Sequence, residues 1–188
     1  MLQATASFIN CVGGVNGDSP TEITRSDVDT VIQALMGNNA WTITDLIQGE
    51  DRFGSSPVRN AYLALCHTDL VSNLNNVAGY TNVSQYPNNN NVPDCEYGAI
   101  SNLRFQVSSI GAIAANASSL GKNVYSIFCT GREAYACVKQ EGYADSFIYR
   151  SPIYSDPLAQ NASIGWKTAM VPRLLNDLWL INLRCTLA

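Results

Sequence analysis

His67 is the only histidine of the chain, and two other side chains of catalytic type, Cys66 and Asp69, stand close to it in sequence. A nucleophilic triad needs a Ser or Cys, a histidine and a carboxylate brought together in space. Successive residues of a strand point to opposite faces of a sheet, so Cys66 and His67 would face apart. We therefore interpret His67 as a structural or capping residue and predict no catalytic residues.

The residue spacing supports neither a metal site nor a phosphate-binding site. The six cysteines are spread over the whole chain without a C-x-x-C pair, the spacing by which many zinc sites are recognised. Gly13, Gly14 and Gly17 resemble a phosphate loop only superficially, because the Lys-Ser/Thr pair of such loops does not follow them. The sequence predicts neither a metal site nor a cofactor.

Four aromatic residues fall in one polar stretch, and two functions could use them. Tyr143, Phe147, Tyr149 and Tyr154 could form a platform on which sugars or bases stack. They could instead pack at a contact between subunits, where tyrosine is enriched. We favour the subunit contact.

The composition indicates a protein that associates with neighbours. Charged residues make up 14% of the chain, against about 25% in an average soluble protein. The basic residues are scattered from Arg25 to Arg184, without the basic stripe of a nucleic-acid-binding protein. No apolar run approaches the roughly 20 residues that span a membrane. Because nothing signals export, the cysteines are predicted to be reduced thiols.

The hydrophobic pattern predicts a mixed α+β fold. A helix is expected over residues 24–36, capped by Thr24 or Ser26 and stopped by Gly37, because its apolar residues recur at intervals of three and four. Strands are expected at 61–66 (covered on both faces), 103–107 (half-buried), 124–130 and 178–187. Further helices are expected at 68–74, capped by Thr68, and at 132–139. Residues 75–97, 111–121 and 142–165 are expected to be loops.

Six phrases of the sequence occur in an order and spacing that resemble the N-four-like family of tailed-phage major capsid proteins. The resemblance runs from about residue 20 to the C terminus, and no single phrase carries it alone. The phrases are Thr24–Met36 with the Gly-Asn-Asn that follows, Ala61–Leu70, Glu96–Ser109, Gly131–Ala136, Asp156–Gln160 and Gly165–Thr168.

The resemblance implies a Hong Kong-97-like capsid fold with axial and peripheral subdomains. Residues 1–59 would hold a lead-in and a peripheral helix, residues 60–150 mainly the axial domain, and residues 151–188 the return to the peripheral sheet, entered at Gly165. The family's N-terminal arm, extended loop and spine helix lie upstream of the matching part. The fold is therefore expected to be partial at its N terminus: the chain is a fragment, or a second chain supplies those elements.

The implied function is a structural major capsid protein that assembles with copies of itself into hexamers and pentamers of an icosahedral shell around the phage genome. Such a protein resides in the virion and is assembled in the host cytoplasm. Decoration or portal proteins are further expected partners, whereas sequence-specific nucleic acid and membrane are not.

Three alternatives remain open from the sequence. An encapsulin-like compartment shares the fold and would contain cargo protein in place of DNA. A cytoplasmic hydrolase would use Cys66 or His67 and would lose activity when His67 is replaced. An extracellular binding module would hold its cysteines in disulfides and show no reactive thiols.

Overall fold

The computed structural model describes residues 7–44, 60–86, 92–139, 146–152, 158 and 160–188. The chain divides into two compact units. Residues 1–134 and 176–188 form the first, which we call the body, and residues 135–175 form the second, which we call the hairpin. The described residues contain many strands and few helices, so the predicted mixed α+β class is confirmed. The assignment of 1–59, 60–150 and 151–188 to axial and peripheral subdomains stays a prediction.

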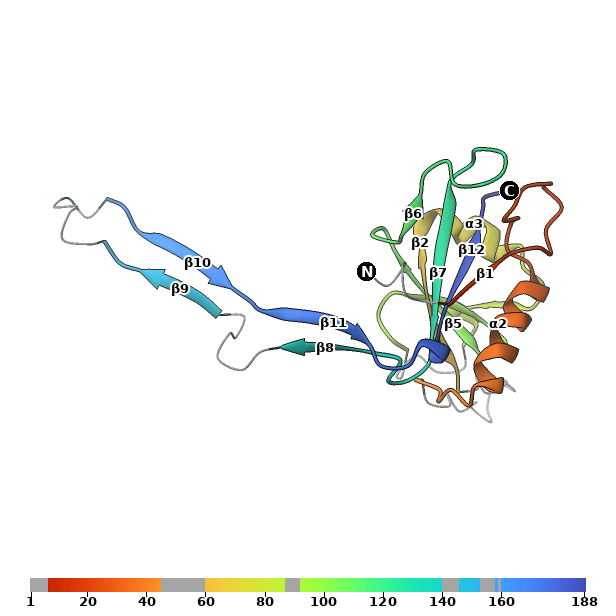
Figure 1. Ribbon diagram of the computed structural model, residues 1–188, viewed down its shortest axis with the longest axis horizontal. Coiled ribbons are helices and arrows are strands. Elements are labelled where there is room, and N and C mark those ends of the chain that lie inside the picture. The colour runs from red at the N-terminus through yellow and green to blue at the C-terminus, as the bar shows by residue number, and fades with distance from the viewer. Residues whose placement is uncertain (1–6, 45–59, 87–91, 140–145, 153–157, 159) are drawn as a thin grey trace. The chain divides into compact units, whose positions relative to one another are not determined.

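A mixed sheet of eight strands forms the body (Figure 1). The strand order is β1-β12-β7-β2-β5-β4-β3, and β6 pairs with one end of β7. The neighbours β1/β12 and β2/β5 are parallel, and the other pairs are antiparallel. The strands are β1 (Ser7–Asn10), β2 (Tyr62–His67), β3 (Tyr80–Asn82), β4 (Glu96–Ile100), β5 (Leu103–Ser108), β6 (Ile113–Ala114), β7 (Val124–Thr130) and β12 (Leu180–Cys185).

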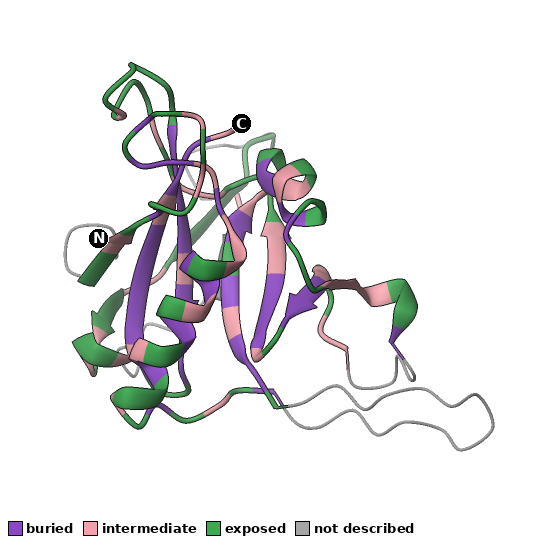
Figure 2. Cartoon of the chain, turned by 90° about the vertical axis from the view of Figure 1, so that its right-hand side faces the viewer, coloured by how far each residue is buried: buried purple, intermediate pink, exposed green. Residues whose placement is uncertain are grey.

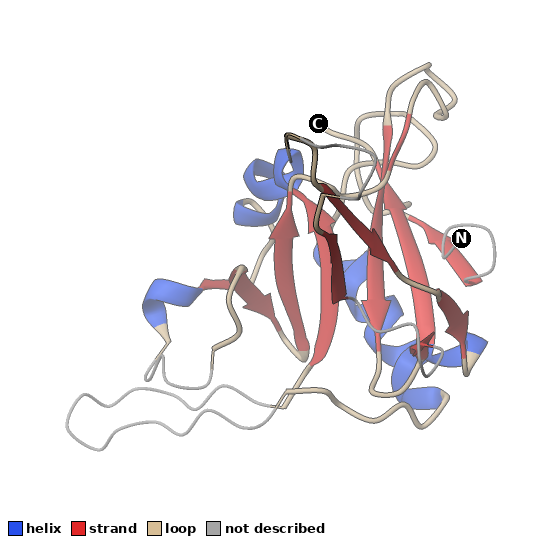
Figure 3. Ribbon diagram, turned by 90° about the vertical axis from the view of Figure 1, so that its left-hand side faces the viewer, coloured by secondary structure: helices blue, strands red, loops and turns tan. Residues whose placement is uncertain are grey.

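Helix α2 (Arg25–Gly37) covers one face of this sheet, as Figures 2 and 3 show from its two sides. Val28, Val31 and Leu35 on the helix are fully buried and belong to one core cluster with Ile181 and Leu183 of β12. The spacing of three and four in the sequence therefore marked the buried stripe correctly. Burial of such side chains is the main favourable term that holds a helix on a sheet.

The two ends of α2 are built by polar side chains. Thr24 is the N-cap, and Asp27 completes a capping box with it. The Asp27 carboxylate accepts from the Thr24 amide at 3.1 Å and from the Thr24 hydroxyl at 2.6 Å. The expected stop at Gly37 is wrong in detail, because Gly37 is the last residue of the helix and Asn39 is the residue with a positive φ, of 55°. Asparagine tolerates this left-handed conformation better than most residues.

Strands β2, β5, β7 and β12 confirm the predicted strands to within two residues, but two burial predictions are wrong. Strand β2 is not covered on both faces, since Leu65 is 38% exposed. Arg104 of β5, expected on a solvent face, is fully buried. Its Nη1 lies 3.8 Å from Oε2 of the equally buried Glu96, so the buried guanidinium faces an opposite charge.

Much of the polar stretch 75–97, expected to be a loop, forms regular elements. It includes the end of α3 (Val71–Asn75), strand β3 and the 3-10 turn η2 (Val83–Gln85). Tyr86 is buried, and its hydroxyl donates to Oε1 of Glu96 at 2.7 Å. A buried aromatic ring with a satisfied hydroxyl supplies the burial that the asparagines lack. Asn88–Asn91 lie outside the described residues.

The hairpin contains two antiparallel ladders. Strand β8 (Tyr135–Lys139) pairs with β11 (Met170–Leu174), and β9 (Ser146–Arg150) pairs with β10 (Ser163–Lys167). The helix expected at 132–139 is therefore wrong, because pairing with β11 overrides the helix propensity of its alanines. The loop expected at 142–165 is wrong where β9 and the start of β10 fall.

The chain re-enters the main sheet only after the hairpin. The Gly165–Lys167 segment belongs to β10 inside the hairpin. Residues 177–179 then form the turn η3 (Asp177–Trp179), and β12 enters the sheet between β1 and β7. The hairpin is thus an insertion between two neighbouring strands of the body, β7 and β12.

Candidate functional site

His67 caps a turn. It is the N-cap of the 3-10 turn η1 (Thr68–Leu70), and its Nδ1 accepts from the Asp69 amide at 3.1 Å. Its Nε2 lies 3.1 Å from the carbonyl oxygen of Ser109. The capping role predicted for His67 is confirmed, whereas Thr68, expected to be the cap, is the first residue of the turn.

Asp69 contacts His67, with its Oδ2 3.2 Å from Nδ1 of the histidine, but Cys66 has a different partner. The Cys66 thiol lies 3.4 Å from the carbonyl oxygen of Gln106. Burial raises the pKa of this thiol to about 12, so it stays protonated at neutral pH and is a poor nucleophile. Oδ2 of Asp69 accepts from the Tyr125 hydroxyl at 3.0 Å. The arrangement supplies neither an activated nucleophile nor a base directed at one.

The glycine-rich loop at residues 12–17 binds carboxylates of its own chain. The amides of Val12 and Gly13 donate to Oδ1 of Asp27 at 3.0 and 3.2 Å. The amides of Val15 and Asn16 donate to the two carboxyl oxygens of Glu22 at 2.7 and 3.2 Å. These amide donors, which a phosphate loop would direct at its ligand, are therefore already used.

We expect the Glu22 contribution to stability to disappear in acid. The Val15 amide, with that of Asn16, outweighs burial and lowers the pKa of Glu22 below its ordinary value of 4.5. A depressed folded pKa stabilises the protein above the unfolded value, and this stabilisation is lost as the pH falls through the folded pKa.

Urea unfolding of the wild type and Glu22→Gln at about pH 7 and about pH 3 measures this effect. The midpoint of Glu22→Gln should be lower than that of the wild type at neutral pH, and the difference should shrink in acid. A difference independent of pH would contradict the assignment. Asp29→Asn is the control, since Asp29 bonds no loop amide.

The β9–β10 ladder carries a continuous apolar face. Phe147 lies directly opposite Trp166, and Tyr149 lies opposite Ile164. Residues two apart on a strand share a face, so these four side chains lie on one side of the ribbon. Their exposed fractions are 78%, 67%, 62% and 71%. We call Phe147, Tyr149, Ile164 and Trp166 the aromatic face.

An exposed aromatic face on a two-stranded ribbon indicates an interaction surface. Isolated two-stranded hairpins are marginally stable in water, and contiguous apolar patches on soluble proteins usually mark binding sites. Phe147 and Tyr149 were predicted at a subunit contact, whereas Tyr143 and Tyr154 lie outside the described residues. Ile164 and Trp166 were missed, because only the cross-strand register places them beside Phe147 and Tyr149.

The cysteines form no disulfide among the described residues. All six cysteines are free, in agreement with the prediction of reduced thiols. Among the described residues, no group of three or more His, Cys, Asp or Glu side chains could hold a metal ion. None of the described helices is long and apolar enough to cross a membrane.

Comparison with solved structures identifies a chain with a similar fold. No family model and no curated protein matches the sequence. A chain in the head structure of Helicobacter pylori bacteriophage KHP40 is similar to this chain with a TM-score of 0.52 and 11% identity. The match covers 98% of this chain, which spans 62% of the length of the phage chain. The chain therefore has a fold similar to that of a phage head chain, which agrees with the coarser part of the predicted capsid fold.

Proposed function

We propose that this chain is a structural subunit of a tailed-phage head, with a Hong Kong-97-like fold, related to the N-four-like major capsid proteins. Copies of it assemble into the hexamers and pentamers of an icosahedral shell that encloses the genome in the virion. The observation that carries the proposal is the aromatic face on a fold that resembles a phage head chain.

The aromatic face has the composition of an assembly contact. The cores of protein interfaces are enriched in aromatic residues and depleted of charge, and the four side chains of this face are apolar or aromatic. A closed shell repeats one contact around symmetry axes, so a contact of moderate strength becomes strong through its many copies.

The chain covers only part, 62%, of the length of the phage chain that it resembles. An N-terminal arm, an extended loop and a spine helix would come from a longer version of this chain or from a second chain. Decoration and portal proteins are the other expected contacts.

Electron microscopy of native particles, with the copy number of this chain measured by mass spectrometry, tests the proposal. We expect on the order of hundreds of copies in an icosahedral shell that contains DNA. A shell filled with cargo protein would favour the encapsulin-like alternative. A monodisperse monomer that joins no particle would contradict the capsid function.

A further inference from the structure

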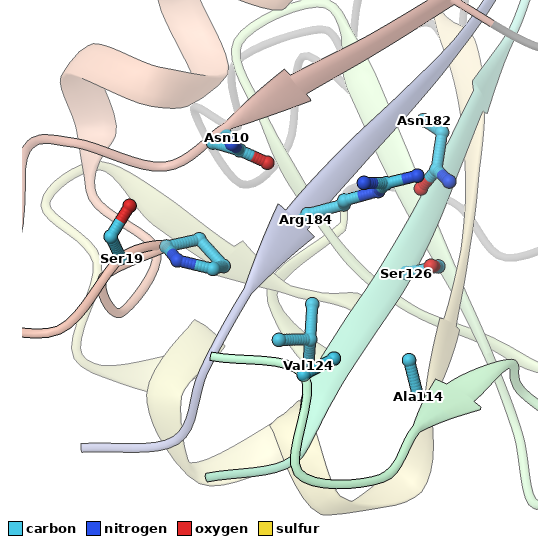
Figure 4. Close-up of a pocket in the computed structure, with 9 residues that line it drawn as sticks. Asn10, Ser19, Ala114, Val124, Ser126, Asn182 and Arg184 are labelled. Carbon is cyan, nitrogen blue, oxygen red and sulfur yellow. The ribbon is translucent and has the colours of Figure 1, made fainter. Parts of the chain in front are cut away.

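A polar pocket lies on the face of the body's sheet that is turned away from α2. Its volume is about 270 Å³, and it is lined by residues of β1, β6, β7 and β12, the β6–β7 loop and the turn at Ser19 and Pro20 (Figure 4). Asn182 and Arg184 of β12 line it, whereas the alternate residues Ile181 and Leu183 belong to the core under α2. The strand alternation separates the two sets.

Asn182 is the first sign that the pocket holds a ligand. Only 1% of its surface is exposed, yet neither its Oδ1 nor its Nδ2 has a hydrogen-bond partner in the part of the chain that the structure describes. Its neighbours across the sheet are Phe8 on β1 and Phe128 on β7. Buried amides are almost always hydrogen-bonded, so an unpaired one that lines a pocket indicates a polar group from outside.

Arg184 is the second residue that indicates a ligand in this pocket. Asn10 on β1 and Ser126 on β7 are its neighbours across the sheet, so three polar side chains form a row over three strands. The guanidinium stacks on the Phe8 ring, 4.1 Å from its centre, and Figure 4 shows the side chain directed along β12 toward Asn182. Stacking by its flat face leaves the N–H groups at its edge available for a ligand.

The donor set selects a carboxylate. The lining residues include one guanidinium, two carboxamides and two hydroxyls, but no Asp or Glu. A guanidinium fork matches the two oxygens of a planar carboxylate. A phosphate carries up to two negative charges, and a single cation would neutralise only part of that charge.

We propose that this pocket binds a carboxylate group, with Arg184 pairing with its oxygens and the Asn182 amide donating to one of them. The carboxylate comes either from a small molecule or from the acidic side chain of a neighbouring polypeptide. The proposal does not depend on shell formation, because the pocket lies within one chain.

NMR titration of the full 15N-labelled chain in its unassembled form tests the proposal. Sodium acetate and N-acetylglutamate amide are the carboxylate probes, and sodium chloride at the same ionic strength is the reference. We expect a saturable shift of the Asn182 side-chain amide and of the Arg184 Nε–H signal with both carboxylates. Arg184→Gln should weaken binding about tenfold or more, whereas the matched charge change Arg132→Gln, at an exposed arginine, should leave it unchanged.

Asn182→Val separates binding from folding. It should weaken carboxylate binding, seen as a higher concentration for half-saturation of the Arg184 shift, without lowering the melting temperature, because it removes a buried amide that has no partner. Tighter binding of N-acetylglutamate amide than of acetate would assign the site to acidic side chains, and equal binding would assign it to free carboxylates.

Three outcomes would overturn the proposal. The first is that carboxylates cause the same shifts as chloride, so that only water occupies the pocket. The second is unchanged binding in Arg184→Gln. The third is tighter binding of inorganic phosphate than of acetate. None of these results depends on whether the chain forms a shell, so the two proposals can fail separately.

Discussion

We expect Phe147→Ser combined with Trp166→Ser to abolish the particle assembly proposed above while the body stays folded. The two side chains lie directly opposite each other on the aromatic face, 78% and 67% exposed. Aromatic anchors at protein interfaces commonly cost about 2 kcal/mol or more each when truncated. Because every subunit of a shell repeats the contact, this loss is multiplied. Sedimentation and electron microscopy measure assembly, and near-ultraviolet circular dichroism reports on the packing of the body.

Ile148→Ser is the matched control for the aromatic face. Ile148 is 53% exposed and lies on the same strand, but its side chain points to the opposite side of the ribbon. We expect this variant to assemble. Normal assembly of the double variant would show that the aromatic face is not part of the interface. Equal loss in Ile148→Ser would show that the hairpin as a whole, and not one face of it, makes the contact.

Asp27→Ala should cost about 3 kcal/mol of unfolding free energy. The carboxylate is 4% exposed and accepts hydrogen bonds from the amides of Val12, Gly13 and Thr24 and from the Thr24 hydroxyl. It thereby joins the first turn of α2 to the loop that follows β1. Removing it leaves several donors short of a partner, and each such loss costs about 1 kcal/mol or more. Urea unfolding followed by circular dichroism measures the effect.

Asp29→Ala, two residues further along the same helix, is the control for Asp27→Ala. Asp29 pairs with Arg25 at 3.0 Å on the surface of the same helix, and exposed pairs of this spacing contribute about 0.5 kcal/mol. Asp27→Asn keeps one acceptor oxygen and should fall between the two variants. If Asp27→Ala and Asp29→Ala lost equal stability, the carboxylate of Asp27 would not be the link between loop and helix.

Local patterns in the sequence predicted the parts of the fold that local forces decide. The buried stripe of α2 and the strands β5, β7 and β12 were found because their apolar periodicity is strong. Arg104 was misplaced because alternation alone assigns it to the solvent side. Its partner Glu96 lies on β4, where the register shifts between Glu96 and Gly98, and no periodicity predicts such a bulge.

The candidate sites depended on pairings that the sequence does not reveal. Residues 132–139 were assigned to a helix because their partner strand β11 comes more than thirty residues later in the chain. Trp166 becomes part of the aromatic face only through its register with Phe147. Asn182 and Arg184 gain their significance from Asn10 and Ser126, which come from two other strands. Buried polar residues at such sites are where pattern-based prediction is expected to fail.

The place of β12 in the sheet fixes the order in which the chain can fold. This strand lies between β1 and β7, so β1 has no partner strand until residues 180–185 have been synthesised. Contacts so distant in sequence form slowly, because a long loop must close first. During translation the aromatic face emerges before β12, the strand that completes the body's sheet. The nascent chain thus exposes the aromatic face while the edge of β7 that pairs with β12 still lacks its partner strand. Such a state is prone to premature association.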